Sequence, residues 1–281
     1  MDIDFSNIPF PPTQKAKFNF IDLFCGIGGF RIAFQNNGGR CVFSSDWDKG
    51  AKNTYFNNYG EVPFGNIRLF TDKGVSDKEL DALIPDHDVL AAGFPCQPFS
   101  RAGVSARNAL GKVNGFLDTN QGNLFFDIVR IVKVKKPKVL FLENVKNLQS
   151  HDDGNTFAVV KNTIEALGYS FDCNVIDART TVPQKRQRCY MVCFRDKETP
   201  FFKFPEFDGT PVPLKSILEK KVPDSYTISD RLWLGHQNRT AKNLARGTGF
   251  TAFTANLSQP SNTLVARYGK DGKECLIPQK G

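Results

Sequence analysis

Long apolar runs are missing from this sequence of 281 residues. No stretch of about eighteen uncharged apolar residues occurs, so no membrane-spanning helix is predicted. Residues 1–17 are polar and contain prolines, without the apolar segment and cleavage site of a secretory signal. We therefore expect a soluble, cytoplasmic protein without a membrane partner.

Paired cysteines are missing as well. The seven cysteines are scattered, with no Cys-x-x-Cys pair and no Cys/His spacing of a zinc site. An odd number of cysteines in a reducing compartment favours free thiols over a disulfide framework. We predict neither structural disulfides nor a bound metal.

Positive charge is in excess. The formal net charge is +8 and the isoelectric point is near 9.1. Lysines and arginines that neutralise phosphates gain from the release of counterions, so the excess favours a polyanionic partner such as nucleic acid. Charge alone is equally compatible with a basic protein that has no such partner.

Short apolar segments alternate with helix-like segments through the first two thirds of the chain. Strands are predicted at residues 18–24, 41–45, 88–92, 139–142, 169–173 and 190–194. Helices are predicted at residues 30–34, in a stretch after residue 46 that ends near residue 58, at 124–134 and at 157–167. This alternation predicts an α/β fold with a doubly wound, mostly parallel, Rossmann-like sheet. Ligands of such sheets bind at the carboxyl ends of the strands.

The alternation stops near residue 195, where prolines become frequent. We therefore predict two domains, one of residues 1–198 and a smaller one of residues 199–281. The smaller domain is expected to be irregular and mainly β.

A glycine-rich turn follows the first predicted strand, in Phe24-Cys-Gly-Ile-Gly-Gly29. Glycines at a strand-to-helix turn allow a close approach of ligand to backbone. The NAD fingerprint would require glycine where Arg31 stands, so that cofactor is disfavoured. Asp46, at the end of the second strand, can accept hydrogen bonds from ribose hydroxyls, and Trp47 can stack on adenine. Together these residues indicate an adenosine-containing ligand, although each alone would fit a tight turn or a packed tryptophan.

Chemically reactive groups follow two later strands. Cys96 lies between prolines directly after the strand at 88–92, where a thiol can act as a nucleophile if its thiolate is favoured. Glu143 and Asn144 end the strand at 139–142, at the same expected edge of the sheet. Residues 184–188 add hydrogen-bond donors. Taken singly, these features would fit a buried thiol, a helix cap and a solvated loop.

The four motifs, in this order and spacing, resemble the cytosine-5 DNA methyltransferases, most closely the bacterial enzymes of restriction-modification systems. The resemblance covers roughly residues 18–195. It implies a DNA (cytosine-5-)-methyltransferase that transfers a methyl group from S-adenosyl-L-methionine to C5 of a cytosine flipped out of a short duplex site. The implied product is S-adenosyl-L-homocysteine, the implied partner is double-stranded DNA, and the implied compartment is the bacterial cytosol.

The resemblance also implies catalytic roles. Cys96 would attack C6 of the base, and Glu143 would favour protonation at N3. Arg186 and Arg188 would hold the base oxygen and the catalytic loop, and Asn144 would orient the end of the Glu143 strand.

For the cofactor, the resemblance assigns Asp46 to the ribose and Trp47 and Leu124 to the two faces of adenine. Ile67 would line the adenine pocket. The family usually has aspartate where Asn66 stands, but an amide oxygen can also accept from the adenine amine. The other implied cofactor-binding residues are Phe24, Gly26, Gly28, Gly29 and Pro95.

The carboxyl-terminal region is similar to a target-recognition domain that reads sites of the CCGG or CCNGG type, in residues 245–250, 262–264 and 266–272. The implied DNA-binding residues are Ser100, Arg101, Gln184, Arg246, Thr263 and Arg267. The arginines can read guanine edges or bind phosphate, which is the commoner fate of an arginine. Residues 100–122 are similar to the loop that closes over DNA.

One departure from the family lies at the end of the chain, where two further family segments do not occur before residue 281. We therefore expect activity to require a second polypeptide that supplies them. Two other interpretations stay open: a catalytically idle DNA-binding fragment, and an RNA cytosine-5 methyltransferase, because its chemistry is shared. The residues 245–272 favour DNA.

Overall fold

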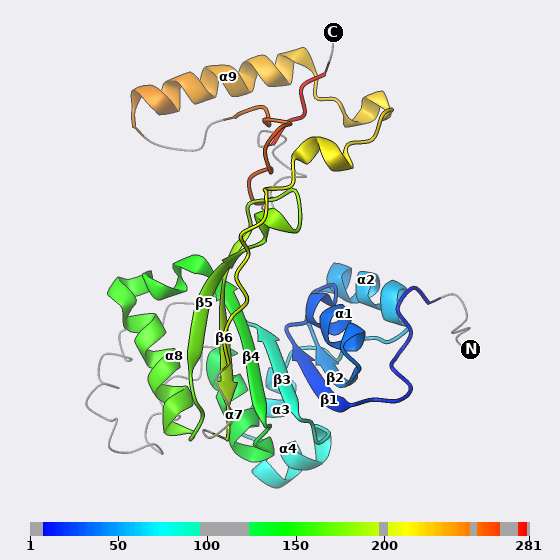
Figure 1. Ribbon diagram of the computed structural model, residues 1–281, viewed down its shortest axis with the longest axis vertical. Coiled ribbons are helices and arrows are strands. Elements are labelled where there is room, and N and C mark those ends of the chain that lie inside the picture. The colour runs from blue at the N-terminus through cyan, green and yellow to red at the C-terminus, as the bar shows by residue number, and fades with distance from the viewer. Residues whose placement is uncertain (1–7, 96–123, 197–201, 248–251, 265–274, 280–281) are drawn as a thin grey trace. The chain divides into compact units, whose positions relative to one another are not determined.

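The computed structural model describes residues 8–95, 124–196, 202–247, 252–264 and 275–279 (Figure 1). The chain divides into two compact units. The first contains residues 1–175 and 188–204, and the second contains residues 176–187 and 205–281. The second unit therefore contains residues 176–187 in addition to the region after residue 204. The functional division at residues 198 and 199 stays a prediction.

The first unit is built on a six-stranded sheet of order β2-β1-β3-β4-β6-β5. The strands are β1 (Phe18–Leu23), β2 (Gly39–Ser45), β3 (Val89–Gly93), β4 (Val139–Val145), β5 (Asp172–Asp177) and β6 (Gln187–Phe194). Strands β1 to β4 pair in parallel with one another, and β6 pairs antiparallel with β4. The predicted α/β, mostly parallel sheet is confirmed. Its chain order reverses at β1, which lies between β2 and β3, and α/β proteins bind ligands at such switch points.

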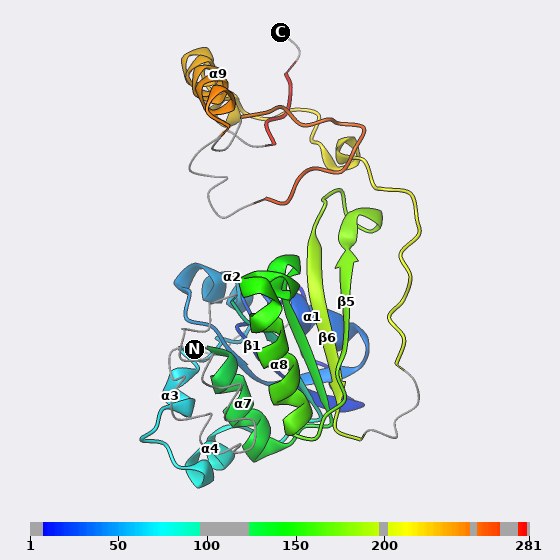
Figure 2. The same cartoon turned by 90° about the vertical axis from the view of Figure 1, so that its left-hand side faces the viewer.

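Helices connect the strands of this sheet. They are α1 (Gly29–Asn36), α2 (Lys49–Tyr59), α3 (Arg68–Thr71), α4 (Asp77–Leu83), α7 (Leu124–Lys135) and α8 (Asn155–Ala166). Short 3-10 helices occur at Lys146–Gln149, His151–Gly154, Ala178–Thr180, Leu214–Ile217 and Asp224–Tyr226. Helices α3, α4, α7 and α8 pack together in a row, and α1 lies on the other face of the sheet (Figure 2).

Alternating side chains of the strands build these two layers. Phe141 of β4 lies against Phe30 and Phe34 of α1, with both pairs of ring centroids 5.6 Å apart. Its neighbours Leu140 and Leu142 are fully buried in the main core with α7 and α8. Successive residues of a strand point to opposite faces, so a strand buried on both faces is apolar throughout.

The fifth strand begins later than predicted, at Asp172 instead of residue 169. Gly168 has a φ of 91° after α8, and the buried Tyr169 donates a hydrogen bond from its hydroxyl to the carbonyl of Pro137 at 2.6 Å. This tertiary anchor delays the strand.

The second unit differs from the expected mainly β domain. Its longest regular element in the described ranges is the helix α9 (Asp230–Ala245). Isolated bridges join Gln184 to Ser261 and Thr254 to Leu276. Ser229 caps the start of this helix, because its hydroxyl accepts from the amide of Leu232 at 3.3 Å. This cap is a local feature of the sequence within a proline-containing region. For the described residues, the prediction that the second domain is mainly β is therefore wrong.

None of the helices in the part of the chain that the structure describes has the length and apolar character to cross a membrane.

The main core provides a stability prediction. Ile128 of α7 is fully buried, so Ile128→Ala is expected to lower the free energy of unfolding by about 2–5 kcal/mol, because it leaves a cavity. Leu69→Ala is the control: Leu69 is 70% exposed, and the expected change is within about 0.5 kcal/mol. Urea titrations measure both variants. Equal losses would contradict this assignment of the core.

Candidate active site

A carboxylate joins the loops that follow β1 and β2. Asp46 follows β2, and one of its oxygens accepts from the amide of Gly26 at 2.8 Å. The other oxygen accepts from the amide of Asp48, also at 2.8 Å. Each carboxylate oxygen has a further lone pair, so Asp46 can still accept hydrogen bonds from a ligand.

Close packing explains the glycine at position 28. Gly28 has a φ of 92°, and a Cβ there would lie 2.3 Å from a ring carbon of Tyr59. The Tyr59 hydroxyl donates to the carbonyl of Gly28 at 2.7 Å, in a buried hydrogen bond. Any side chain at position 28 would therefore clash with Tyr59, so the turn requires glycine there.

A cavity of about 390 Å³ opens beside this turn. It is lined by Phe24, Ser45, Asp46, Trp47, Gly65, Asn66, Ile67, Arg68, Gly93, Pro95 and Leu124. Most of the predicted cofactor-binding residues therefore converge, whereas Gly26, Gly28 and Gly29 form the turn without lining the cavity. Ser45, Gly65, Arg68 and Gly93 were missed, although each lies within three residues of a residue that the sequence had indicated.

The cavity walls suit an adenosine-like ligand. Its volume lies in the range of about 300–1,000 Å³ that is usual for small-molecule sites. Ile67 and Leu124 are apolar, and the indole of Trp47 is 79% exposed. The side-chain oxygen of Asn66 accepts from the amide of Arg68 at 3.1 Å and keeps a second lone pair. Apolar walls with a carboxylate and an amide fit a base and a ribose.

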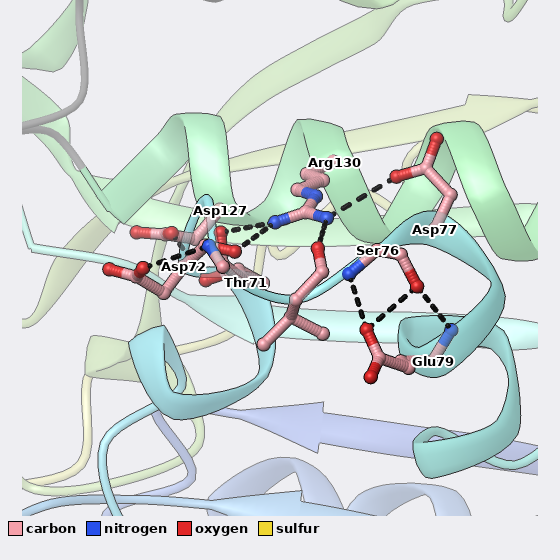
Figure 3. Close-up of polar contacts among 9 residues, drawn as sticks. Thr71, Asp72, Ser76, Asp77, Glu79, Asp127 and Arg130 are labelled. Carbon is pink, nitrogen blue, oxygen red and sulfur yellow. Dashed lines mark hydrogen bonds and ion pairs between the residues drawn. The ribbon is translucent and has the colours of Figure 1, made fainter.

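A polar network holds two walls of the cavity together (Figure 3). Arg130 of α7 donates to the carbonyl oxygens of Thr71 at 2.7 Å and Asp72 at 2.6 Å. The Thr71 hydroxyl donates to Asp127 of α7 at 2.5 Å. Because α7 begins at Leu124, this network fixes that wall of the cavity against α3.

The predicted acid lies next to the cavity. Glu143 pairs in register with Gly93 of β3, and a Cβ on Gly93 would lie 3.4 Å from a carboxyl oxygen of Glu143. On its other side, Glu143 forms an ion pair of 2.8 Å with Arg188 of β6. Both side chains are partly buried, so the arginine fixes the position of the carboxyl group.

Asn144 connects this strand end with the loop that leads to Cys96. Its buried side-chain amide donates to the carbonyl of Phe94 at 2.9 Å, and its oxygen accepts from the amide of Val145 at 2.9 Å. Cys96 lies outside the described residues, as do Ser100, Arg101 and Arg267.

The other predicted residues belong to the second unit. Gln184 forms a bridge with Ser261, and the Thr263 hydroxyl donates to the carbonyl of Lys185, so these two chain segments lie together. Arg186 is exposed on the first segment, and Arg246 is exposed at the end of α9.

A cluster around the buried Arg31 lies behind the glycine-rich turn. Arg31 of α1 donates to both carboxyl oxygens of Glu61 at 2.7 Å and to the Tyr55 hydroxyl at 3.0 Å. Its guanidinium carbon lies 5.0 Å from the ring centroid of Tyr59, the residue that holds Gly28. In the sequence, Arg31 indicates only that NAD is disfavoured as a cofactor. Its structural role shows only when α1 packs on α2.

Asp22 of β1 lies fully buried near this cluster, and its carboxyl oxygens have no hydrogen-bond partner in the described structure. Burial raises its pKa to about 8, although the positive charge of Arg31 acts in the opposite direction.

Comparisons with known proteins agree with the motifs. The family described as C-5 cytosine-specific DNA methylase matches residues 18–280. The chain is 46% identical to the type II methyltransferase M.SsoII of Shigella sonnei, over 99% of this chain and 71% of that protein. It is 40% identical to a DNA-cytosine methyltransferase of Escherichia coli K12, over 96% of this chain and 64% of that protein. The chain thus spans 64% to 71% of the length of these two relatives.

Solved structures with the same fold include a mutant of DNMT2 from Spodoptera frugiperda, with a TM-score of 0.66 and 22% identity over 94% of this chain and 75% of that one. The methyltransferase EhMeth of Entamoeba histolytica has a TM-score of 0.61 and 20% identity over 95% of this chain and 79% of that one. The resemblance seen in the sequence is confirmed. These matches do not support the expected second polypeptide.

The buried carboxyl of Asp22 predicts a pH dependence of stability. Between about pH 4 and 8 the unfolded chain releases this proton and the folded chain keeps it, so folding is weakened as pH rises, by up to about 1.4 kcal/mol per pH unit. Asp22→Asn resembles the protonated carboxyl and cannot titrate. Urea titrations at pH 5, 6, 7 and 8 should show the variant gaining stability over the wild type as pH rises. Parallel curves would contradict the raised pKa.

Proposed function

Because the chain belongs to the C-5 cytosine-specific DNA methylase family, we propose that it transfers the methyl group of S-adenosyl-L-methionine to C5 of a flipped cytosine in duplex DNA. The names of its type II relatives support a place in a restriction-modification system. One observation carries the proposal: the adenosine-sized cavity has Gly93 in its wall, and Gly93 pairs with Glu143.

The cavity residues account for cofactor binding. S-adenosyl-L-methionine, when bound, supplies an activated methyl group. Asp46 accepts hydrogen bonds from the ribose hydroxyls, and Asn66 accepts from the adenine amine. Trp47 and Leu124 cover the faces of the adenine, and Ile67 closes its edge. Phe24 and Pro95 complete the wall.

The catalytic steps need a nucleophile and an acid. Cys96, as a thiolate, adds to C6 of the cytosine, and Glu143 hydrogen-bonds N3, so that C5 becomes nucleophilic. C5 takes the methyl group and then loses its proton to a general base or to water. Expulsion of the Cys96 thiolate restores the aromatic ring and leaves 5-methylcytosine with S-adenosyl-L-homocysteine.

Three polar side chains position these groups. Arg188 holds the carboxyl of Glu143 through their ion pair. Asn144 fixes the carbonyl of Phe94, two residues before Cys96. Arg186 contacts the base oxygen or the catalytic loop.

Recognition of the target site is assigned to residues 199–281 and the catalytic chemistry to residues 1–198, and both regions contact DNA. The residues proposed to contact DNA are Ser100, Arg101, Gln184, Arg246, Thr263 and Arg267. Gln184 and Thr263 lie on the two segments joined by the bridge to Ser261, which supports a shared role.

The first test is methyl transfer from labelled S-adenosyl-L-methionine to mixed-sequence duplex DNA. The wild type is expected to label DNA, and Cys96→Ser is expected to lose activity by on the order of 10³-fold or more, because the nucleophile is removed. Cys173→Ser is the matched control and should keep its activity. Labelling by Cys96→Ser at the wild-type rate would overturn the mechanism, and labelling of transfer RNA in place of DNA would favour the RNA enzyme.

The amide at position 66 predicts a gain on substitution. Asn66→Asp keeps the acceptor for the Arg68 amide and offers the adenine amine a charged acceptor, which makes roughly twice as strong a hydrogen bond. The dissociation constant of S-adenosyl-L-homocysteine should therefore fall by about tenfold for a gain of about 1.4 kcal/mol. Calorimetry measures it, and Asn57→Asp, an equal charge change at an exposed site of α2, is the control. Weaker binding by Asn66→Asp than by the control would contradict the assigned role.

A further inference from the structure

Helix α9 carries basic residues along one face. Arg231, Arg239 and Lys242 lie in the helix and Arg246 caps its end, with successive spacings of eight, three and four residues. At 3.6 residues per turn these side chains fall within an arc of about 80°. All four residues are exposed. We refer to them as the α9 basic stripe.

The charge of this stripe is not neutralised in the part of the chain that the structure describes. None of its four residues forms an ion pair there. The acidic residue of α9 is Asp230, which lies about 100° around the helix from Arg231. Gly235 is the other residue within this arc, so no apolar side chain lies between the four basic residues.

A different face of α9 packs inside the second unit. His236 is buried, and Trp233 and Thr240 are partly buried. The Thr240 hydroxyl accepts from the amide of Ala252 at 2.8 Å. These contacts fix the rotation of the helix and keep the basic stripe facing outward.

Helix stability does not account for the stripe. Lys242 and Arg246 lie near the carboxyl end of α9, where cations interact favourably with the helix dipole. Arg231 lies in the first turn, where a cation is unfavourable. Arg231 and Arg239 also lack an acidic residue three or four positions away. The pattern fits an external anion better than an internal pair.

We propose that the α9 basic stripe binds the phosphate backbone of duplex DNA. The inference deepens the proposed function and rests on it. From Arg231 to Arg246 the stripe extends about 22 Å, long enough to follow several successive phosphates. Exposed cations gain from the release of counterions and carry no sequence information. Arg246 is therefore a phosphate contact, which decides between the two roles left open by its sequence.

The test is equilibrium binding of fluorescent duplexes at several salt concentrations, in the presence of S-adenosyl-L-homocysteine. The double variant Arg239→Gln/Lys242→Gln is compared with the wild type on a duplex that contains CCNGG and on one that lacks it. Each phosphate contact contributes about 0.9 to the slope of log K against log salt, so the slope should become about 1.8 shallower. Affinity should fall by the same factor on both duplexes.

Lys220→Gln/Lys221→Gln is the matched control, with the same loss of charge at two exposed sites outside α9. Circular dichroism checks that each variant keeps its helix. An equal slope change in both double variants would overturn the proposal, as would a loss confined to the CCNGG duplex. A wild type that binds no DNA would overturn the proposed function itself, which separates the two failures.

Discussion

The parallel pairing of β1, β3 and β4 is the constraint on which the candidate site depends. Leu23 pairs with Ala92, and Gly93 pairs with Glu143, so three distant segments end at one edge of the sheet. The carboxyl ends of parallel strands point the same way, and the loops that follow them must meet. A change of register by one residue would turn Glu143 to the other face of the sheet.

Backbone hydrogen bonds to side chains then refine this edge. Asp46 accepts from two loops and Asn144 donates to a third, so each loop is held by a group that does not depend on a ligand. Behind the turn, Tyr59 and the buried Arg31 support Gly28. Arg31 is fully buried whereas its partner Glu61 is 40% exposed, so removal of Glu61 would leave a buried charge without its partner, which is costly. Such a cluster holds the turn in one conformation and gives the cavity its shape before any ligand arrives.

The proposed division of labour follows from different physical demands. Chemistry requires a nucleophile, an acid and a cofactor held within tenths of an ångström, which a packed sheet edge provides. DNA binding requires many exposed cations and tolerates looser geometry, because counterion release depends on charge more than on precise contacts. An exposed helix in an irregular unit can meet that demand. The α9 basic stripe thus gives part of the excess positive charge a defined place in the second unit.

The sequence by itself determined the α/β class, the six strands to within a few residues and most of the residues of the cavity wall. These features are local: apolar runs, glycine turns and short motifs carry them, and the resemblance of four motifs linked them to one family. Asp46 and Trp47 could be selected because they stand at the end of a strand, whereas Leu124 was assigned through the family resemblance. Only the tertiary structure decided which side chains support these residues and which complete the cavity wall.

The roles of Arg31, Tyr59 and Gly93 depend on packing between elements that are distant in sequence, as do the late start of β5 and the raised pKa of Asp22. The helix α9 was not predicted, because the region around it is rich in prolines. It forms nonetheless because Ser229 caps it and one of its faces is buried. Motifs record which groups are present. The distances between those groups are set by the pairing and packing of the whole chain, which no single segment contains.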